Sequence, residues 1–378
     1  MRSKRIAYSI SRVLNYLRSW RTDDKIVIIE SDDWGSIRTS TPEAYARLLK
    51  HGYNLHASKY SLDTLETNDD LMELFGILAK QLDSKGNPAC FTANMIMANP
   101  DFDRIQATGF EEYYFESVQN TLSRDLTRNQ VQRLWSVGLK SGLFYCQLHA
   151  RDHLRYWEWL RDLKLNKPEA IETFQYRMCG VPLACSKSYT SYYLPVYVDE
   201  EIFAREKIDQ RKLIEDGFNL FEKEFNMKSL STVAPGIGWT DSTEKVWRNR
   251  GVKYLQGGYL QEHHTINHVK YFPHYLGEKS PNNEMFYLVR NCYFEPSDSK
   301  DNDYWKSTLR QIEIAFRRKT PAIISSHRVN YIGSISESNR EKSLKQLDLL
   351  LGAIVRQWPN VIFENTVQLG KRIFDSYN

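Results

Sequence analysis

Two adjacent carboxylates, Asp32 and Asp33, follow directly after the apolar run of residues 25–29 in KIVIIESDDWG. Such a run is typical of a buried strand. Because burying charge without a partner is costly, we expect a cation beside this pair. The structural alternative is a helix cap or turn, since Asp commonly serves in both.

Histidines follow two other predicted strands. His149 and His153 stand four residues apart after residues 143–148, and His327 follows residues 321–326. Two histidines and one carboxylate form a metal site with open coordination positions. The cation beside the aspartates is therefore predicted to be a divalent metal. The alternative is a pair of histidines that make structural hydrogen bonds.

A second pair with the same spacing, His264 and His268, lies in the polar run QEHHTINH. No predicted strand stands immediately before it, and a pair identified by spacing alone carries a risk of a chance match. We expect an exposed loop here.

Short apolar runs alternate with amphipathic stretches, which is typical of repeated βα units. The predicted strands cover residues 25–31, 89–95, 143–148, 229–233, 253–257, 288–294, 321–326 and 360–364. The predicted helices cover residues 42–51, 68–84, 111–138, 199–226, 241–251, 304–319 and 337–357. Ligand sites in α/β sheets and barrels lie at the carboxyl ends of the strands, so the motifs should gather at one end.

Four motifs stand in a characteristic order: SDDWG at 31–35, HARDH at 149–153, APGIGW at 234–239 and SSHR at 325–328. This series resembles that of the polysaccharide deacetylase family over most of the chain. The resemblance implies an α/β fold, an incomplete (β/α)7 barrel, and metal-dependent hydrolysis of N-acetyl groups on sugars. It implies these roles: Asp32 as general base, His327 as general acid, and Asp33, His149 and His153 as metal ligands.

Each implied role agrees with elementary chemistry. One divalent ion on three protein ligands keeps positions for water and a carbonyl oxygen. Asp32 can take a proton from the attacking water, and His327, whose ordinary pKa is near neutrality, can protonate the leaving amine. We expect zinc, with cobalt, nickel, iron and manganese as alternatives that suit the same ligands.

The sequence departs from the family pattern at two positions. Trp34 stands between the paired aspartates and Gly35, so we expect a differently shaped loop. Ala234 stands where the third motif has an arginine that orients the catalytic Asp. Arg151 and Arg328 are candidates for that charge and for substrate contact, although a structural arginine is more common. Glu295 is our candidate for the acidic partner of His327.

Aromatic platforms for a sugar are expected near the motifs. Trp34 and Trp239 stand beside them, and ordinary packing is the alternative for each. Residues 165–198 interrupt the βα rhythm and are predicted to form a loop insertion that serves as a lid. Four more aromatic candidates lie in or just after it: Tyr189, Tyr192, Tyr193 and Tyr197.

Residues 1–24 are predicted to form an amphipathic helix packed on a single barrel of residues 25–378. The apolar stripe comprises Ile6, Ile10, Val13, Leu14 and Leu17. Most such stripes face a core, so we favour docking on the barrel over peripheral contact with an anionic membrane through residues 1–20.

Composition narrows the class of protein. The 378 residues hold 51 Lys and Arg against 47 Asp and Glu, and this small excess does not indicate nucleic-acid binding. Five cysteines without a CxxC pair fit free thiols in a reducing compartment. No export signal or membrane span is evident, so a cytoplasmic location is expected.

Three functions compete. The first is a metal-dependent carbohydrate deacetylase, an amide hydrolase of polysaccharide metabolism. The second is a non-catalytic family member that binds glycan or a protein partner, which Ala234 motivates. The third is a non-haem iron oxygenase with the same ligand count, which the ligand order and alternating helices disfavour.

Overall fold

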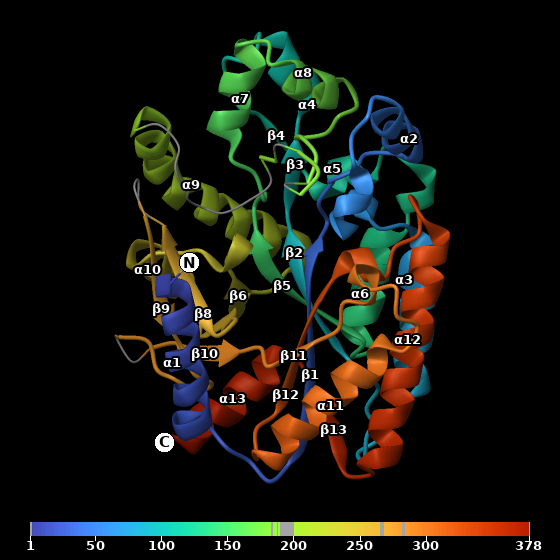
Figure 1. Ribbon diagram of the computed structural model, residues 1–378, viewed down its shortest axis with the longest axis vertical. Coiled ribbons are helices and arrows are strands. Elements are labelled where there is room, and N and C mark those ends of the chain that lie inside the picture. The colour runs from blue at the N-terminus through green and yellow to red at the C-terminus, as the bar shows by residue number, and fades with distance from the viewer. Residues whose placement is uncertain are drawn as a thin grey trace.

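The computed structural model describes residues 2–182, 184–186, 188–189, 200–264, 268–281 and 284–377. At its centre is one curled sheet of parallel strands (Figure 1). The strands are β1 (Lys25–Trp34), β2 (Phe91–Ile96), β5 (Phe144–Ala150), β6 (Ser231–Val233), β7 (Tyr254–Gly257), β10 (Phe286–Val289), β11 (Cys292–Tyr293), β12 (Ala322–His327) and β13 (Val361–Phe363). Their order is β10-β7-β6-β5-β2-β1-β12-β11, with β13 beside β1.

The sheet curls until its two edges come together. Strands β10 and β11 are the edges, and only Arg290 and Asn291 separate them along the chain. The Arg290 amide donates to Gly257 O on β7 at 2.8 Å, and the Asn291 amide donates to Ile323 O on β12 at 3.0 Å. This curled parallel sheet is consistent with the predicted incomplete barrel.

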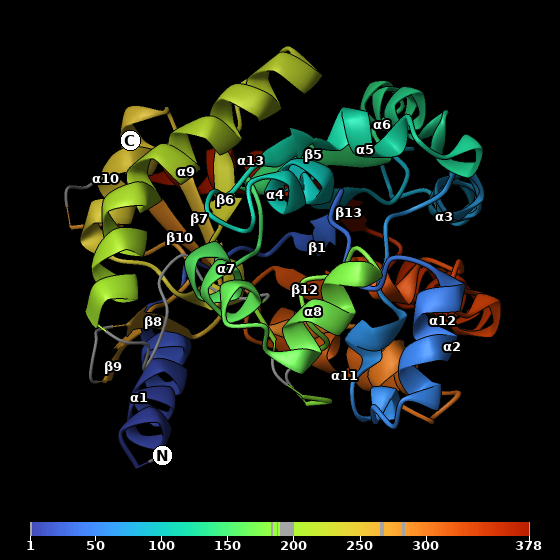
Figure 2. The same cartoon turned by 90° about the horizontal axis from the view of Figure 1, so that it is seen from above.

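Helices surround the strands (Figure 2). They are α1 (Arg2–Arg18), α2 (Pro42–Lys50), α3 (Asn68–Lys80), α4 (Phe102–Ala107), α5 (Val118–Leu122), α6 (Val131–Lys140), α7 (Tyr156–Lys164), α8 (Pro168–Gln175), α9 (Glu200–Phe225), α10 (Asp241–Asn249), α11 (Tyr304–Arg317), α12 (Glu337–Gln357) and α13 (Thr366–Ser376). Two short hairpins lie outside the main sheet: β3 (Ala98–Pro100) with β4 (Phe115–Ser117), and β8 (Leu260–His264) with β9 (Val269–Pro273). Because helices cover the sheet, its central strands are buried almost throughout.

One predicted helix and part of the predicted loop insertion differ from the structure. Residues 111–138 do not form one helix, since strand β4 and helix α5 precede α6. Residues 168–175, predicted to belong to a loop, form helix α8, which begins at Pro168 as helices commonly do. Residues 183, 187 and 190–198 of the predicted insertion lie outside the described residues, Tyr192, Tyr193 and Tyr197 among them. The lid therefore remains a prediction.

The second histidine pair is only partly as expected. His264 ends strand β8 and is buried, with Nε2 3.0 Å from a Glu262 oxygen. His268 is exposed. The prediction of an exposed loop is therefore wrong for His264.

Helix α1 packs on the hairpin of β8 and β9 with its polar side. The buried Ser11 hydroxyl donates to Tyr259 O at 2.6 Å, and Asn15 Nδ2 donates to His274 O at 2.6 Å. Of the apolar stripe, Leu14 is half-buried, whereas Ile6, Ile10, Val13 and Leu17 are exposed. The helix therefore contacts the hairpin largely through polar groups, and not through the stripe that was expected to face the core. The division into residues 1–24 and 25–378 remains a prediction. Among the described residues, no helix combines the length and apolar character needed to cross a bilayer.

Candidate metal centre and active site

A bulge in β1 turns both adjacent aspartates toward one cavity. Neighbouring residues of a regular strand point to opposite faces of the sheet. Here the pairing of β1 with β2 shifts register between Ser31 and Trp34, and Asp33 has a φ of 77°. Such a bulge re-aims side chains. Asp32 and Asp33 consequently line the same cavity, although they are consecutive.

Trp34 and Gly35, which directly follow the two aspartates, hold this bulge in place. Trp34 is fully buried, packs edge-on against Phe144, and donates from Nε1 to Ser31 Oγ at 3.0 Å. Gly35 has a φ of 86°, and a Cβ there would lie 2.4 Å from Ile96 O. Trp34 therefore extends the strand into the core, which corrects its prediction as a substrate platform.

Three side chains could hold a metal ion. One ligand atom each from Asp33, His149 and His153 lie within 4.8 Å of one another. His149 Nδ1 lies 2.8 Å from Val233 O on the adjacent strand, so this nitrogen carries the proton and Nε2 is the nitrogen with a lone pair for a metal. His149 Nε2 is 3.7 Å from Asp33 Oδ1.

His153 provides a test of whether a metal fits. Its buried Nδ1 has no hydrogen-bond partner among the described residues. Burial, together with the nearby charge of Arg38, lowers the pKa of His153 to about 3, so the ring is neutral. A neutral imidazole with an unpaired buried nitrogen is the form that ligates a divalent cation. The donor set therefore fits such an ion.

A chain of buried ion pairs holds Asp33. Arg38 Nη2 lies 3.0 Å from Asp33 Oδ2, and Arg38 Nε lies 2.9 Å from Asp63 Oδ2. Arg328 pairs with Asp63 Oδ1 at 3.0 Å and with Glu66 Oε2 at 2.9 Å. Although burial alone would raise the pKa of Asp33, Arg38 and the neighbouring histidines hold it well below its usual range.

Asp32 is held by a different arginine, Arg290. Arg290 Nη1 lies 2.7 Å from Asp32 Oδ2, Nη2 lies 2.8 Å from Oδ1, and Nε lies 2.6 Å from Glu30 Oε2. Asn94 Nδ2 also donates to Asp32 Oδ1 at 2.7 Å. Burial opposes ionisation of Asp32, but the Arg290 charge prevails and lowers the pKa to about 2. Arg290 thus supplies the orienting charge that Ala234 lacks.

His327, at the end of β12, has the expected acidic partner. Its Nδ1 lies 2.5 Å from Glu295 Oε1, while Lys59 Nζ and Asn330 Nδ2 contact Glu295 Oε2 at 2.7 and 2.8 Å. Burial alone would lower the pKa of His327, but the Glu295 charge more than offsets this and raises it. The contact fixes the ring with Nε2 directed away from the carboxylate.

These groups share one cavity of about 710 Å³, a size typical of ligand sites. Its wall combines charged and apolar side chains. The lining residues include Asp32, Asp33, Arg38, Lys59, Tyr60, His149, His153, Pro182, Ala184, Val233, Ala234, Ile237, Arg290, Tyr293, Glu295 and His327. The predicted catalytic and metal-binding residues are therefore brought together.

The other residues predicted to contact the substrate do not line this cavity. Arg151 is buried and pairs with Asp152 at 2.8 Å, and Arg328 is fully buried in the ion-pair chain. Trp239 is buried and donates from Nε1 to Glu244 Oε1 at 2.8 Å. Tyr189 is also buried, and its hydroxyl donates to Asp162 Oδ2 at 2.8 Å. None of these side chains lines the cavity, so they are corrected to structural residues.

Sequence analysis missed Arg290 and Arg38. Arg290 lies inside the run LVRNCYF, predicted as one strand over 288–294, whereas β10 ends at Val289. A lone charge within an apolar run was the available signal, because a buried charge needs a charged or polar partner. For Arg38, the sequence offered only its nearness to the paired aspartates.

Comparison with known proteins yields only remote structural likeness. No family model matches the sequence, and no curated protein matches it. Among solved structures, a provisionally assigned polysaccharide deacetylase from Mycobacterium smegmatis is 11% identical with a TM-score of 0.41, covering 95% of this chain and 93% of that one. A provisionally assigned glycoside hydrolase/deacetylase from Parabacteroides distasonis is 6% identical with a TM-score of 0.48, covering 94% and 72%.

A third similar structure is a CE4 family pseudoenzyme from Bacillus anthracis. It is 10% identical with a TM-score of 0.35, covering 92% of this chain and 66% of that one. Identities and scores at this level establish neither a shared family nor a shared activity. The function must therefore be inferred from the chemistry of the site itself.

Proposed function

We propose that this chain is a metal-dependent hydrolase that removes an N-acetyl or related acyl group from a carbohydrate. One observation carries the proposal: a three-donor metal set shares a cavity with an ionised carboxylate and a carboxylate-paired imidazole. Amide hydrolysis needs a Lewis acid, a proton acceptor and a proton donor, and these groups can supply all three. The series of four sequence motifs supports the same assignment.

Asp33, His149 and His153 would hold the ion. When bound, a divalent cation would polarise the acyl carbonyl and acidify a water molecule. We expect zinc, although cobalt, nickel, iron and manganese suit the same donors.

Asp32 would accept the proton of the attacking water. A carboxylate has about four acceptor positions, and Arg290 and Asn94 occupy three of them. One position on Oδ2 stays available for the proton. Because both oxygens are held by buried donors, the carboxylate is oriented before substrate arrives.

His327 would donate a proton to the departing amine. An amine is a poor leaving group unless it is protonated, and the Glu295 charge keeps the imidazolium populated above its ordinary pKa of 6.5. Because Nδ1 of His327 is hydrogen-bonded to Glu295, Nε2 is the atom that would donate the proton to the amine. The apolar wall of Val233, Ala234 and Ile237 gives the methyl of an acetyl group a place to pack.

The two other functions are less well supported. The hypothesis of a non-catalytic protein rested on Ala234 in place of an orienting arginine. Arg290 supplies that charge to Asp32, so this reason no longer holds. An iron oxygenase uses the same ligand count, but it needs no paired general acid such as His327 with Glu295.

Acetate release tests the proposal. Protein purified without a histidine tag and supplied with zinc or cobalt is incubated with a panel of N-acetylated mono- and oligosaccharides, and free acetate is quantified. We expect release by the wild type that Asp32→Asn and His327→Ala abolish, while Arg310→Gln, at an exposed position, should release acetate as the wild type does. Oxygen consumption with ferrous iron, or hydrolysis that survives Asp32→Asn, would contradict it.

A further inference from the structure

Helix α1 presents a continuous apolar stripe to solvent. Ile6, Ile10, Val13 and Leu17 are 53%, 47%, 56% and 65% exposed. Their spacing of four, three and four residues puts them on one side of the helix. Single exposed apolar residues are ordinary, but a contiguous stripe of this kind marks an interaction surface.

The opposite side of α1 fixes how this stripe is presented. Ser11 and Asn15 donate to backbone carbonyls of Tyr259 and His274, and Lys4 Nζ pairs with Glu262 Oε1 at 2.7 Å. These polar contacts specify the orientation of the helix. The outward direction of the stripe is therefore part of the fold.

Unpaired cations flank the stripe. At 100° per residue, Arg5 and Arg12 lie on one side of it and Arg18 lies on the other. Within the described part of the chain, no acidic side chain pairs with Arg5, Arg12, Arg18 or the neighbouring Arg318. Residues 1–22 contain no Asp or Glu at all.

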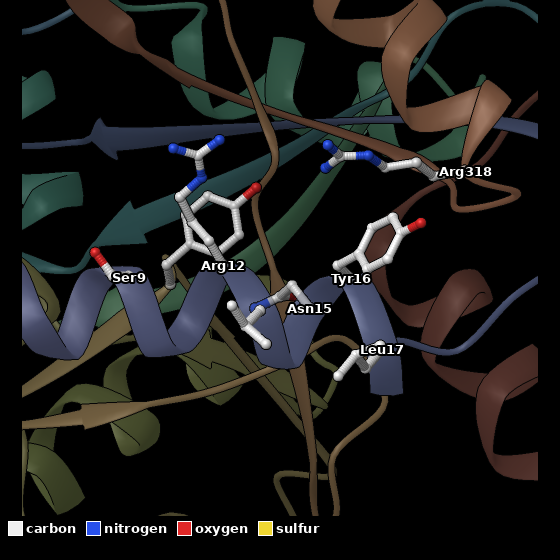
Figure 3. A pocket seen from close by; sticks show the side chains of 8 residues that line it. Ser9, Arg12, Asn15, Tyr16, Leu17 and Arg318 are labelled. Atoms are coloured by element: carbon white, nitrogen blue, oxygen red, sulfur yellow. The ribbon is translucent and has the colours of Figure 1, made fainter.

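Two of these guanidinium groups border one pocket of about 410 Å³. Figure 3 shows Arg12 and Tyr16 extending from α1 toward the side on which Arg318 lies. The Arg318 guanidinium carbon is 5.7 Å from the centre of the Tyr16 ring. The pocket is lined by Ser9, Arg12, Val13, Asn15, Tyr16, Leu17, Tyr259 and Arg318. Guanidinium groups bind phosphate well, and Val13 and Leu17 continue the apolar stripe to the same place.

We propose that α1 docks on the surface of an anionic phospholipid membrane, with its apolar stripe at the acyl boundary and Arg12 and Arg318 on lipid phosphate. A helix with an apolar side, flanking arginines and an interfacial Tyr is the kind that lies in this interface. A second copy of the chain is the poorer occupant. Each copy carries four arginines without an acidic partner among the described residues, so a dimer formed through this stripe would bring eight positive charges together. An anionic surface would instead neutralise them.

This placement would bring the cavity near the membrane. The Tyr8 ring of α1 packs edge-on against Tyr259. Glu262, whose carboxylate pairs with Lys4 of α1, accepts at its backbone O from Trp239 N, two residues after the cavity-lining Ile237. An acyl sugar attached to a lipid would then reach the site. This last point rests on the proposed hydrolase function, but the docking itself does not.

Co-sedimentation with vesicles tests the docking without any activity assay. We expect the full chain to bind vesicles of phosphatidylcholine mixed with phosphatidylglycerol, and not phosphatidylcholine alone. Val13→Glu with Leu17→Glu should weaken binding by about tenfold or more, because a carboxylate would have to enter the acyl boundary. Arg12→Gln with Arg318→Gln should weaken it about tenfold and flatten its salt dependence.

The matched control is Leu126→Glu with Leu165→Glu, which makes the same chemical change at positions 84% and 62% exposed. It should bind as the wild type does. The proposal is overturned if the wild type ignores anionic vesicles, binds neutral ones equally well, or keeps its binding in the Val13 and Leu17 variant. A dimer detected by light scattering and abolished by that variant would overturn it in favour of self-association.

Discussion

The Arg290 guanidinium holds the Asp32 carboxylate by two parallel contacts, Nη1 to Oδ2 at 2.7 Å and Nη2 to Oδ1 at 2.8 Å. Arg290 lies in the two-residue link that brings the edges of the sheet together. Closure of the sheet and orientation of the proposed general base therefore depend on the same residue. A bidentate arginine also restricts the carboxylate plane, which a single lysine contact would not.

Arg290→Gln should reduce acetate release by about 100-fold or more, because a positioned charge in a buried site is lost. Without that charge, burial dominates and the pKa of Asp32 rises from about 2. Since the ionised form is the active one, the acidic limb of the pH profile should move to higher pH. A pH profile with an unchanged acidic limb would contradict this assignment, and Arg310→Gln controls for loss of an exposed arginine.

Glu295→Gln should move the basic limb of the pH profile to lower pH. Glu295 raises the pKa of His327 against the effect of burial, so the imidazolium persists to higher pH in the wild type. Removing the charge lowers that pKa, and the proton donor is then lost earlier as pH rises. The measurement is kcat as a function of pH.

Lys59→Met should change the pKa of His327 in the direction opposite to Glu295→Gln. The Lys59 charge lowers the pKa of His327, and Lys59 Nζ lies 2.7 Å from Glu295 Oε2. Its removal should move the basic limb to higher pH, opposite to Glu295→Gln. If both variants shift the limb in one direction, the charge account of His327 is wrong.

Gly35→Ala should destabilise the protein by more than a strained φ alone explains. The methyl group would lie 2.4 Å from Ile96 O, behind the bulge that aims the aspartates. Gly52→Ala is the matched control, because its φ is 91° with no atom within 4 Å of the added Cβ. We expect a loss of about 1 kcal/mol at Gly52 and clearly more at Gly35 in urea unfolding. Equal losses would contradict the proposed packing.

Arg328→Met should affect stability rather than substrate affinity. The change leaves Asp63 and Glu66 buried without their cation, which costs about 3 to 5 kcal/mol. KM should stay near the wild-type value in the folded fraction, since Arg328 does not line the cavity. A raised KM with unchanged stability would restore Arg328 as a substrate contact.

The strands and the motif residues at their ends could be predicted from the sequence because they depend on local pattern. Apolar runs buried on both faces identified the strands of the sheet, and the carboxyl-end rule brought Asp32, Asp33, His149 and His327 together. The helix predicted over residues 111–138 was wrong because residues 115–117 pair with strand β3 as a strand, which a helical period cannot reveal.

Partners that meet through the fold could not be predicted in the same way. Arg290 and Asp32 are 258 residues apart, and only closure of the sheet brings them into contact. The orientation of α1 was also beyond pattern analysis. An apolar stripe normally faces the core, but here Ser11 and Asn15 find carbonyl partners on the hairpin and turn the stripe outward.

The most direct test of the central claim is the metal content of the tag-free protein, measured by elemental mass spectrometry after reconstitution with zinc or cobalt. We predict about one divalent ion per chain, lost in His149→Ala with His153→Ala. The control is His264→Ala with His268→Ala, which removes the other pair of equal spacing and should leave the ion in place. A wild type without metal, or equal metal in all three proteins, would contradict the assignment of Asp33, His149 and His153 as its ligands.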